Sequence, residues 1–359
     1  MTSKARFMFF DVGQGDATLL IMPEGECMLI DNKGGGKVDV REFLKEILPT
    51  KNGKPYLNYF VLTHAHADHV GSVNELFDDF EINEVWYTGF DFKGKEEDDL
   101  CEQYKQFLEI IEARKEKHED KELSLESAKP IVISIGDVIF EILSPPSREI
   151  WDELQEEKDL KEYMQKLNEY VKKSEDKELG NLIHIGSVVM RITYKSSSVM
   201  ITGDSELLSW KYWIVPNFSD YCASELLHAS HHGSKGFFIS DADCEKDESF
   251  DENTPGCYTE GLLKIDPAAV VITNNTKPGE KEHKSPPNEH AIKLYKTFKE
   301  TDREVLFTSD GSIEYILPDA EFSFYGSDIK NKFKIKLEEQ EIAYGKHRDS
   351  SVLPINKFG

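Results

Sequence analysis

Short apolar runs alternate with turn-forming residues over the first third of the chain. The apolar runs are rich in β-branched, aromatic and leucine residues and predict strands at 6–12, 17–22, 27–31, 59–62 and 84–87. Apolar residues spaced three and four apart predict helices at 38–48 and 70–80. Turns that contain Gly or Pro separate the first three runs, so we expect the chain to open with a β-meander.

Two later segments are highly charged but keep an apolar stripe at helical spacing. The stripe of residues 93–129 consists of Leu100, Tyr104, Phe107, Leu108 and Ile111. The stripe of residues 149–173 consists of Ile150, Leu154, Tyr163, Leu167 and Tyr170. Such stripes normally pack on the body of a protein, and binding of a partner is the alternative. We therefore predict two acidic helical insertions, at about 93–129 and 147–180, the first ending in a solvated tail.

Strands and helices interleave over the rest of the chain. Strands are predicted at 131–143, 185–194, 198–202, 225–228 and 269–273, and helices at 205–214 and 288–299. A final hairpin is predicted at 304–317, turning on Asp310-Gly311. Since the order lacks βαβ regularity, we expect an α/β fold of two mixed sheets with helices outside, an αββα sandwich. We assign residues 1–320 to this domain and 321–359 to a C-terminal extension.

The chain is strongly acidic, with 68 Asp and Glu residues against 43 Lys and Arg residues and a formal net charge of −25. Hydrophobic residues make up 39% of the sequence, which excludes a disordered chain. An acidic surface repels nucleic acids and anionic membranes at long range. A polyanionic substrate would therefore need a local basic patch or bound cations, whereas solubility alone is the simpler explanation of the acidity.

The cysteines and the N-terminal residues predict a cytoplasmic protein. Five cysteines, an odd number without CxxC spacing, indicate reduced thiols rather than a disulfide framework or a cysteine-based zinc site. The apolar run before Asp11 is too short for a signal peptide, and no stretch approaches the length of a membrane span. We expect no membrane association.

The strongest chemical signal is the sequence THAHADH at 63–69, directly after the apolar run 59–62. Four side chains of metal-binding type fall within six residues: His64, His66, Asp68 and His69. Imidazole nitrogen and carboxylate oxygen are both good zinc donors. On a loop between a strand and a helix, two of them can face one metal and two a second. Ordinary surface or core histidines are the alternative, but they rarely occur at this spacing beside a carboxylate.

This motif resembles the HxHxDH signature of the metallo-β-lactamase superfamily. More narrowly, DVGQGDA at 11–17 resembles the opening motif of the hydrolase domain of ComEC-type DNA-uptake proteins. Two further motifs follow in the same order, TGD at 202–204 and HHGS at 231–234. The resemblance covers roughly residues 6–316, with the two helical insertions as extra material, and it is more specific for the family than for the substrate.

The resemblance implies roles for residues outside the HxHxDH motif. Asp204 would bridge two metals, although it could also cap a helix. One of His231 and His232 would complete the second metal site and the other would contact the substrate or leaving group, and the sequence does not separate their roles. Acidic side chains behind the ligands would orient them, and these are Asp11, Asp16 and Asp31.

The remaining predicted site residues match the family pattern less closely. His184 lies where a ligand would complete the first metal site, with a buried structural histidine as the alternative. Asn274, His283 and Lys284 are predicted at the substrate-binding rim. His228 takes the place of a lysine in ComEC-like chains and could approach an anionic substrate. Four lysines could supply a short basic track near the rim: Lys264, Lys277, Lys281 and Lys284.

These residues predict a metal-dependent hydrolase with two divalent ions, either Zn²⁺ or Mn²⁺. Asp68 would orient and deprotonate the attacking water. Our first hypothesis is phosphodiester hydrolysis with DNA or RNA as substrate. One alternative is hydrolysis of small esters, lactones, β-lactams or phosphorylcholine-type diesters on the same fold. Another is a module with weak or no activity, controlled by a protein partner bound to the helical insertions.

Overall fold

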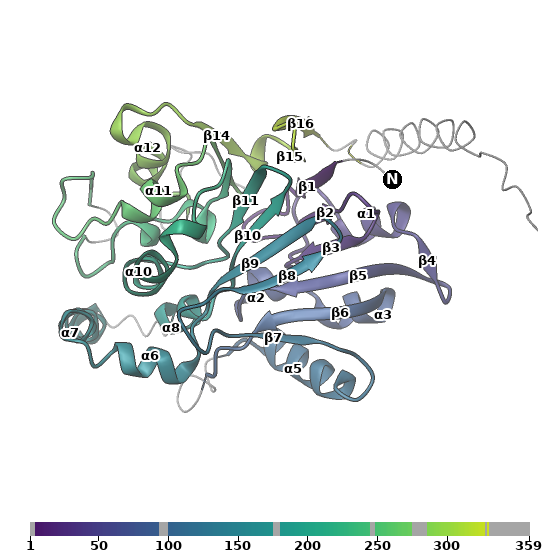
Figure 1. The fold of residues 1–359 in the computed structure, drawn as a ribbon, viewed down its shortest axis with the longest axis horizontal. Helices are drawn as coiled ribbons and strands as arrows, with labels where there is room; N and C mark the ends of the chain where they lie inside the picture. The colour runs from purple at the N-terminus through teal and green to yellow at the C-terminus, as the bar shows by residue number, and fades with distance from the viewer. Residues whose placement is uncertain are drawn as a thin grey trace, which may run out of the picture.

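The computed structural model describes residues 4–92, 100–174, 180–244, 248–274, 286–326 and 329. Two β-sheets face each other in this part of the chain, with helices on both outer sides (Figure 1). The first sheet has the order β16-β15-β1-β2-β3-β5-β6-β7, with β4 paired to β5, and the second has the order β14-β13-β12-β11-β10-β9-β8. The predicted αββα sandwich is therefore confirmed.

The strands of the first sheet come from both ends of the described chain. They are β1 (Ala5–Phe9), β2 (Thr18–Ile21), β3 (Cys27–Ile30), β4 (Thr50–Lys51), β5 (Lys54–Leu62), β6 (Glu81–Thr88), β7 (Lys121–Leu123), β15 (Ser312–Leu317) and β16 (Glu321–Tyr325). The second sheet consists of β8 (Ile131–Ile135), β9 (Val138–Ser144), β10 (Val189–Tyr194), β11 (Ser197–Ile201), β12 (Leu226–His228), β13 (Ala269–Ile272) and β14 (Glu304–Phe307).

The helices are mostly short. They are α1 (Val40–Ile47), α2 (Ala67–Val70), α3 (Val73–Asp79), α5 (Glu102–Arg114), α6 (Arg148–Leu154), α7 (Lys158–Ser174), α8 (Gly180–Ile185), α9 (Leu207–Ser209), α10 (Val215–Phe218), α11 (Glu260–Ile265) and α12 (Glu289–Thr297). A π-helical turn at Trp210–Ile214 joins α9 to α10. Side-chain caps fix three of the starts, since Asp39 accepts a hydrogen bond from the backbone N–H of Glu42, Ser147 accepts one from that of Ile150, and Asn288 caps α12.

Successive side chains of the first sheet point to opposite faces, so the sheet contributes to two separate hydrophobic cores. Phe7 and Phe9 of β1 belong to the cluster between the two sheets, whereas Met8 and Phe10 belong to the cluster on the opposite face. That opposite face is covered by α1, α3 and α5, which contribute Phe43, among other residues. Figure 1 shows these three helices on one side of the molecule and α10, α11 and α12 on the other.

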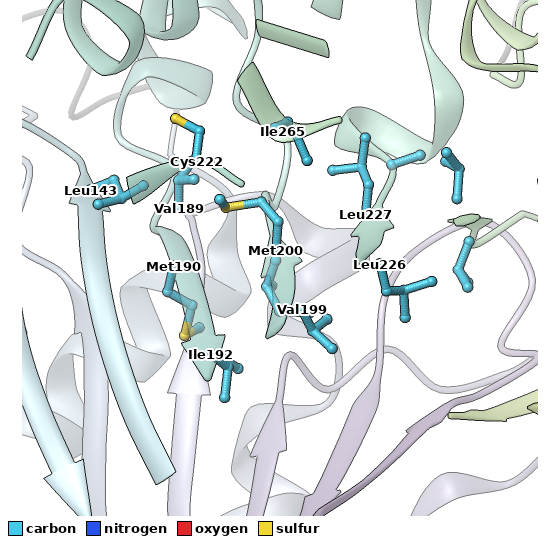
Figure 2. Close-up of a cluster of buried hydrophobic side chains, with 14 of the residues drawn as sticks. Leu143, Val189, Met190, Ile192, Val199, Met200, Cys222, Leu226, Leu227 and Ile265 are labelled. Carbon is cyan, nitrogen blue, oxygen red and sulfur yellow. The ribbon is translucent and has the colours of Figure 1, made fainter. Parts of the chain in front are cut away.

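The second sheet is buried on both faces around β10, β11 and β12. Met200 of β11 lies on one face with Leu227, and Val199 lies on the other face with Ile192 and Leu226, as the strand register requires (Figure 2). Each of these five side chains is fully buried. Burial on both faces explains why these strands appear in the sequence as continuous apolar runs rather than as alternating ones.

The segment predicted as a first helical insertion is part of the central architecture. The predicted helix is present as α5, and it packs on the face of the first sheet beside α2 and α3. The tail after it is not fully solvated, because β7 pairs in parallel with β6 through Trp86 and Lys121. Thus β6, α5 and β7 form a crossover unit that extends the sheet. The strand was missed because KEL at 121–123 has no apolar alternation.

The second charged segment forms two helices, α6 and α7, rather than one. Tyr163 of α7 donates a hydrogen bond from its hydroxyl to Asp243 Oδ2 at 2.9 Å, and Lys166 pairs with the same carboxylate. Ser240 also donates to Asp243, at 2.8 Å. This carboxylate therefore fastens α7 to the loop that follows the HHGS motif.

The predicted hairpin at 304–317 is wrong. β14 pairs in parallel with β13 in the second sheet, whereas β15 pairs with β1 in the first sheet. The turn at Asp310-Gly311 therefore carries the chain from one sheet to the other. β15 instead forms a hairpin with β16, which begins at Glu321 and pairs with it over five residues. A DG turn is a local signal, and the partner of each strand is decided by tertiary packing.

Disulfides and membrane-spanning helices are both absent from the described part of the chain. All five cysteines lie in the described part of the chain, and none of them forms a disulfide. Within the described ranges, no helix is both long enough and apolar enough to cross a bilayer.

Candidate metal centre

The residues of the HxHxDH, TGD and HHGS motifs converge at one edge of the sandwich. Asp31 follows β3 and His64 follows β5, and these two strands run parallel in the first sheet. Asp204 follows β11 and His232 follows β12, which run parallel in the second sheet. The carboxyl ends of parallel strands meet at the same edge. Since the sheets face each other, four loops from two sheets meet in one place.

One donor group consists of Asp68, His69 and His232 around one oxygen of Asp204. His69 Nε2 lies 3.1 Å from Asp204 Oδ1 and 3.4 Å from His232 Nε2. His232 Nε2 also lies 3.4 Å from Asp68 Oδ2. Donor atoms of His69, His232, Asp204 and Asp16 lie within 4.8 Å of one another, which is the kind of arrangement that a divalent cation requires, and Asp68 approaches this set through His232.

A second donor group lies on the other side of Asp204. His64 Nε2 lies 3.4 Å from Asp204 Oδ2, and the ring of His66 is 5.0 Å from that of His64 between centroids. The ring of His184 lies 4.9 Å from that of His66. His184 is the last residue but one of α8, just before the strand predicted at 185–194, and it is 7% exposed.

Asp204 belongs to both groups and lies between them. It is 1% exposed, yet neither of its carboxylate oxygens accepts a hydrogen bond. The Nε2 atoms of His64 and His184 are also buried and make no hydrogen bond. Buried polar atoms are normally satisfied, and a buried carboxylate without partners is costly. Two cations, one on each side of Asp204, would satisfy all of these atoms at once, so the donor set fits a two-metal centre.

The structure separates the two histidines that the sequence left equivalent. His231 and His232 both adopt positive φ values, 47° and 53°, and their rings are 6.0 Å apart between centroids. His232 is fully buried and joins the group around His69. His231 lies on the side of His184, with its Nδ1 atom 2.7 Å from Glu206 Oε1. Donor atoms of His232 thus gather with those of His69 and Asp16, whereas those of His231, which is 24% exposed, gather with those of His184, and Asp204 is common to both sets.

Acidic side chains contact the donor group of His69 and His232 from behind. Asp31 Oδ2 lies 2.7 Å from His69 Nδ1, and the same carboxylate accepts hydrogen bonds from the backbone N–H and the hydroxyl of Thr63. Asp16 Oδ1 lies 3.6 Å from His232 Nδ1 and 3.3 Å from His228 Nε2. Asp16 and Asp31 thus lie where the sequence predicted orienting carboxylates.

Asp11 has different partners. Its Oδ2 atom lies 3.0 Å from Lys37 Nζ, and its backbone N–H donates to the hydroxyl of Ser312. These contacts join β1 to β15 and to the glycine-rich loop. The predicted contact between Asp11 and a ligand is therefore not seen, because its side chain faces Lys37 rather than a histidine.

The charges of the site are balanced by histidine protons when no cation is bound. Burial lowers the pKa of His69, but Asp204 and Asp31 raise it well above its ordinary value. Burial also opposes protonation of His232, yet Asp204 and Asp16 raise its pKa to about 10. Burial tends to raise the pKa of Asp204, whereas the surrounding histidines hold it well below its usual range. The buried carboxylates therefore stay ionised and demand positive charge nearby.

The match to a protein-family model decides the family. The model for the metallo-β-lactamase superfamily matches residues 10–240, more than half of the chain. The chain belongs to the metallo-β-lactamase superfamily. The match includes the HxHxDH, TGD and HHGS motifs and ends in the loop that contacts α7. No curated protein matches the chain.

Several solved structures are similar to this superfamily member. A mutant of the β-hydroxylase CmlA has 12% identity and a TM-score of 0.42, and the match covers 87% of this chain and 53% of that one. Igni18, a metallo hydrolase from Ignicoccus hospitalis, has 13% identity and a TM-score of 0.44, with 87% and 98% coverage. A long form of RNase Z from yeast has 14% identity and a TM-score of 0.36, with 95% and 45% coverage.

The structure does not place the described residues that were predicted to bind the substrate on the open side of the metal centre. Asn274 is 1% exposed, and its amide donates to the carbonyl of Pro286, so it supports a loop. His228 is 2% exposed and stacks on Phe9 at 5.4 Å, so it lies beneath the site and not on its open side. Lys264 lies 3.5 Å from Glu260 on α11. Four further predicted residues lie outside the described ranges: Lys277, Lys281, His283 and Lys284.

Glu206 is a site residue that the sequence analysis missed. One of its oxygens lies 2.7 Å from His231 Nδ1, and the other lies 3.3 Å from His184 Nδ1. Burial raises its pKa, but His184 and His231 together hold the pKa of Glu206 far below its usual range. It lies two residues after Asp204 on the same loop, and this position alone did not mark it in the sequence.

Proposed function

We propose that the chain is a metal-dependent phosphodiester hydrolase with nucleic acid as its substrate. The observation that carries this proposal is the position of Asp204 between two buried donor groups, one on each of its oxygens. A carboxylate in this position would be able to bind a cation through each of its oxygens. Paired metals suit displacement at phosphorus, because charge develops there on both the attacking and the leaving oxygen.

We assign His64, His66, His184 and Asp204 to the first metal, and Asp68, His69, His232 and Asp204 to the second. His64, His69 and His232 are fully buried, which fixes the rings that would hold the ions. Bound divalent ions would supply Lewis-acid stabilisation of phosphoryl oxygens and an acidified water. Zinc suits this histidine-rich set, and manganese is the alternative to be tested.

Asp68 is the carboxylate that faces the open side of the centre. Its side chain is 29% exposed, whereas Asp204 is buried beneath it. Its Oδ2 atom is oriented by His232, which leaves the carboxylate able to accept a proton from an attacking water. We assign Asp68 this role in addition to metal binding.

His231 occupies the opposite side of Asp204. Its Nδ1 atom is held by Glu206, so its Nε2 atom points into the site, 3.7 Å from Asp204 Oδ2. A protonated imidazole at this point can donate a proton to the leaving alkoxide of a nucleic-acid strand. In this scheme Glu206 positions His231.

Nucleic acid is the proposed substrate because the four motifs together resemble the ComEC-type hydrolase domain. The net charge of −25 argues against broad tracking of phosphates on the protein surface. The centre itself, with two cations, would provide the positive field that a phosphodiester needs. Binding is accordingly expected to involve few phosphates.

The proposal is tested by metal analysis together with a substrate panel. Protein expressed with zinc or manganese should contain up to two ions per chain and hydrolyse DNA, RNA or bis-p-nitrophenyl phosphate. The His64→Ala, His66→Ala double variant should lose activity and most of the metal while keeping its far-UV spectrum. A metal-loaded protein that opens a lactone or a β-lactam and leaves every phosphodiester intact would refute phosphodiester hydrolysis. A chain without metal after metal-replete expression would refute the metal centre itself.

A further inference from the structure

A cavity of about 370 Å³ lies beside α2, the helix that carries Asp68 and His69. Its lining includes Lys33, Ala67, Ser72, Asn74, Gln103 and Gln106. Ala67 connects the cavity to the centre, because its two neighbours in the chain are His66 and Asp68. These two are partly exposed, whereas His64 and His69 are fully buried. The cavity therefore lies beside the face through which the donor atoms reach solvent.

The lining of this cavity is chemically suited to a phosphate group. Lys33 supplies an ammonium group, and the other polar lining residues named above supply one hydroxyl and three amides. Among the described residues that line it, Glu75 carries the sole carboxylate, and Arg41 pairs with it at 2.6 Å. The described lining includes no aromatic side chain on which a base could stack. Hydrogen-bond donors around one ammonium group, without a stacking surface, favour the backbone of a nucleic acid over its bases.

Backbone hydrogen bonds fix the position of the Lys33 loop relative to the metal centre. Its N–H donates to the carbonyl of Asp16 at 2.9 Å, and the N–H of Asn32 donates to the carbonyl of His69 at 2.8 Å. A Cβ atom at Gly15 would lie 2.6 Å from Cγ of Lys33, and one at Gly71 would lie 1.8 Å from the carbonyl oxygen of Asn32. Both glycines are therefore required for the close contact between the Lys33 loop, the DVGQGD turn and α2.

We propose that this cavity, the Lys33 pocket, binds a second phosphate of the substrate strand, next to the diester that is hydrolysed. The inference rests on the proposed phosphodiester hydrolysis and narrows it to a substrate with at least two phosphates. The acidic surface of the chain should repel a nucleic acid. One lysine beside two cations would give the local positive charge that the chain as a whole lacks.

Matched dinucleotides test the pocket through catalysis. Thymidine dinucleotide, dTpdT, offers one diester, whereas pdTpdT and dTpdTp add one terminal phosphate at the 5′ or 3′ end. The metal-loaded protein should prefer one phosphorylated form over dTpdT by about tenfold in kcat/KM, as expected for one charge-assisted contact. Lys33→Ala should remove this preference. Lys37→Ala, a change of the same charge on the same loop but outside the pocket, should keep it.

Direct binding gives a second readout that does not depend on turnover. A fluorescein-labelled dT8 strand should bind Lys33→Ala more weakly than Lys37→Ala, with a salt dependence lower by about 0.7 in log–log slope, the value for one phosphate contact. Absence of a preference in the wild-type protein, or equal weakening by both variants, would overturn the pocket. If small diesters are hydrolysed while dT8 binding ignores Lys33, the pocket fails and the proposed function stands. If dT8 binding depends on Lys33 while no diester is cleaved, the pocket stands and the function fails.

Discussion

Nδ1 of His69 lies 2.7 Å from Oδ2 of Asp31, on the side of the ring opposite the nitrogen that approaches Asp204. Asp31 follows β3 and His69 lies in α2, so the contact ties two loops of the first sheet together. The carboxylate keeps the proton on Nδ1 and leaves the lone pair of Nε2 for a cation. Thr63 holds Asp31 in turn through two hydrogen bonds.

Asp31→Asn should therefore weaken one metal site more than the other. The amide cannot hold the His69 ring with the same charge, so the affinity for the second metal should fall by about 10- to 100-fold. Competition with a chromophoric chelator measures both affinities. Asp319→Asn, an exposed carboxylate paired with Lys4, serves as the control and should leave both unchanged. Equal losses at the two sites would show that Asp31 does not act through His69.

The position of Asp204 between the two donor groups predicts unequal effects on metal content. Asp204→Asn should reduce occupancy of both metals, because each loses an anionic ligand. His184→Ala should reduce mainly the first, since His184 lies on the side of His64 and His66. Metal content after dialysis against a weak chelator distinguishes these results. Similar small losses in both variants would mean that the two groups are not joined through Asp204.

A buried polar cluster predicts how strongly β16 is bound to the sandwich. The hydroxyl of Tyr325 donates to Glu314 Oε2 at 2.6 Å, and the other oxygen of Glu314 pairs with Arg6, which is 1% exposed. Tyr325→Phe removes a charge-assisted bond from a buried carboxylate and should lower the free energy of unfolding by about 1.5–3 kcal/mol. Urea denaturation measures this change. Glu321→Gln on the exposed side of the same strand should change it by less than about 0.5 kcal/mol, and an equal effect would exclude the proposed role of Tyr325.

The fold was largely predictable because its signals are local. Buried strands such as β3 and β11 are short apolar runs bounded by turns, and Asp39 and Asn288 mark helix starts with their side chains. β7 was not predictable, because a three-residue edge strand of mixed charge has no pattern of its own. The route of the chain after β14 was missed for a different reason, since the choice of sheet depends on packing between segments far apart in sequence.

The site also contains residues that could be predicted from the sequence and residues that could not. The HxHxDH motif is contiguous, so its residues could be named from the sequence, and the TGD and HHGS motifs supplied Asp204 and His232. Their grouping around Asp204 needed the structure, because it depends on loops from two sheets. Glu206 was missed because a glutamate after a TGD motif carries no periodic or spacing signal. The partner of Asp11 could not be predicted either, because nothing in the DVGQGDA motif indicates a contact with Lys37.

The contact between Glu206 and His231 predicts a dependence on the leaving group. Glu206→Gln should leave the imidazole of His231 poorly oriented and less protonated, so proton donation to a poor leaving group should suffer. Hydrolysis of dTpdT, whose leaving group is an alkoxide, should slow by about 100-fold. Hydrolysis of bis-p-nitrophenyl phosphate, whose leaving group needs no proton, should slow much less. Steady-state kcat on the two substrates, compared with the exposed control Glu260→Gln, measures the difference.

Gly236 offers an independent way to disturb the same carboxylate without changing its chemistry. A Cβ atom at this position would lie 2.0 Å from Glu206 Oε1, so Gly236→Ala must displace the carboxylate from His231. Gly236→Ala should therefore reproduce the leaving-group dependence of Glu206→Gln, with a smaller loss because the negative charge remains nearby. Metal content should stay close to wild type in both variants, apart from a modest loss through His184. If both variants slow the two substrates equally, Glu206 supports the metals through His184 rather than the leaving group through His231.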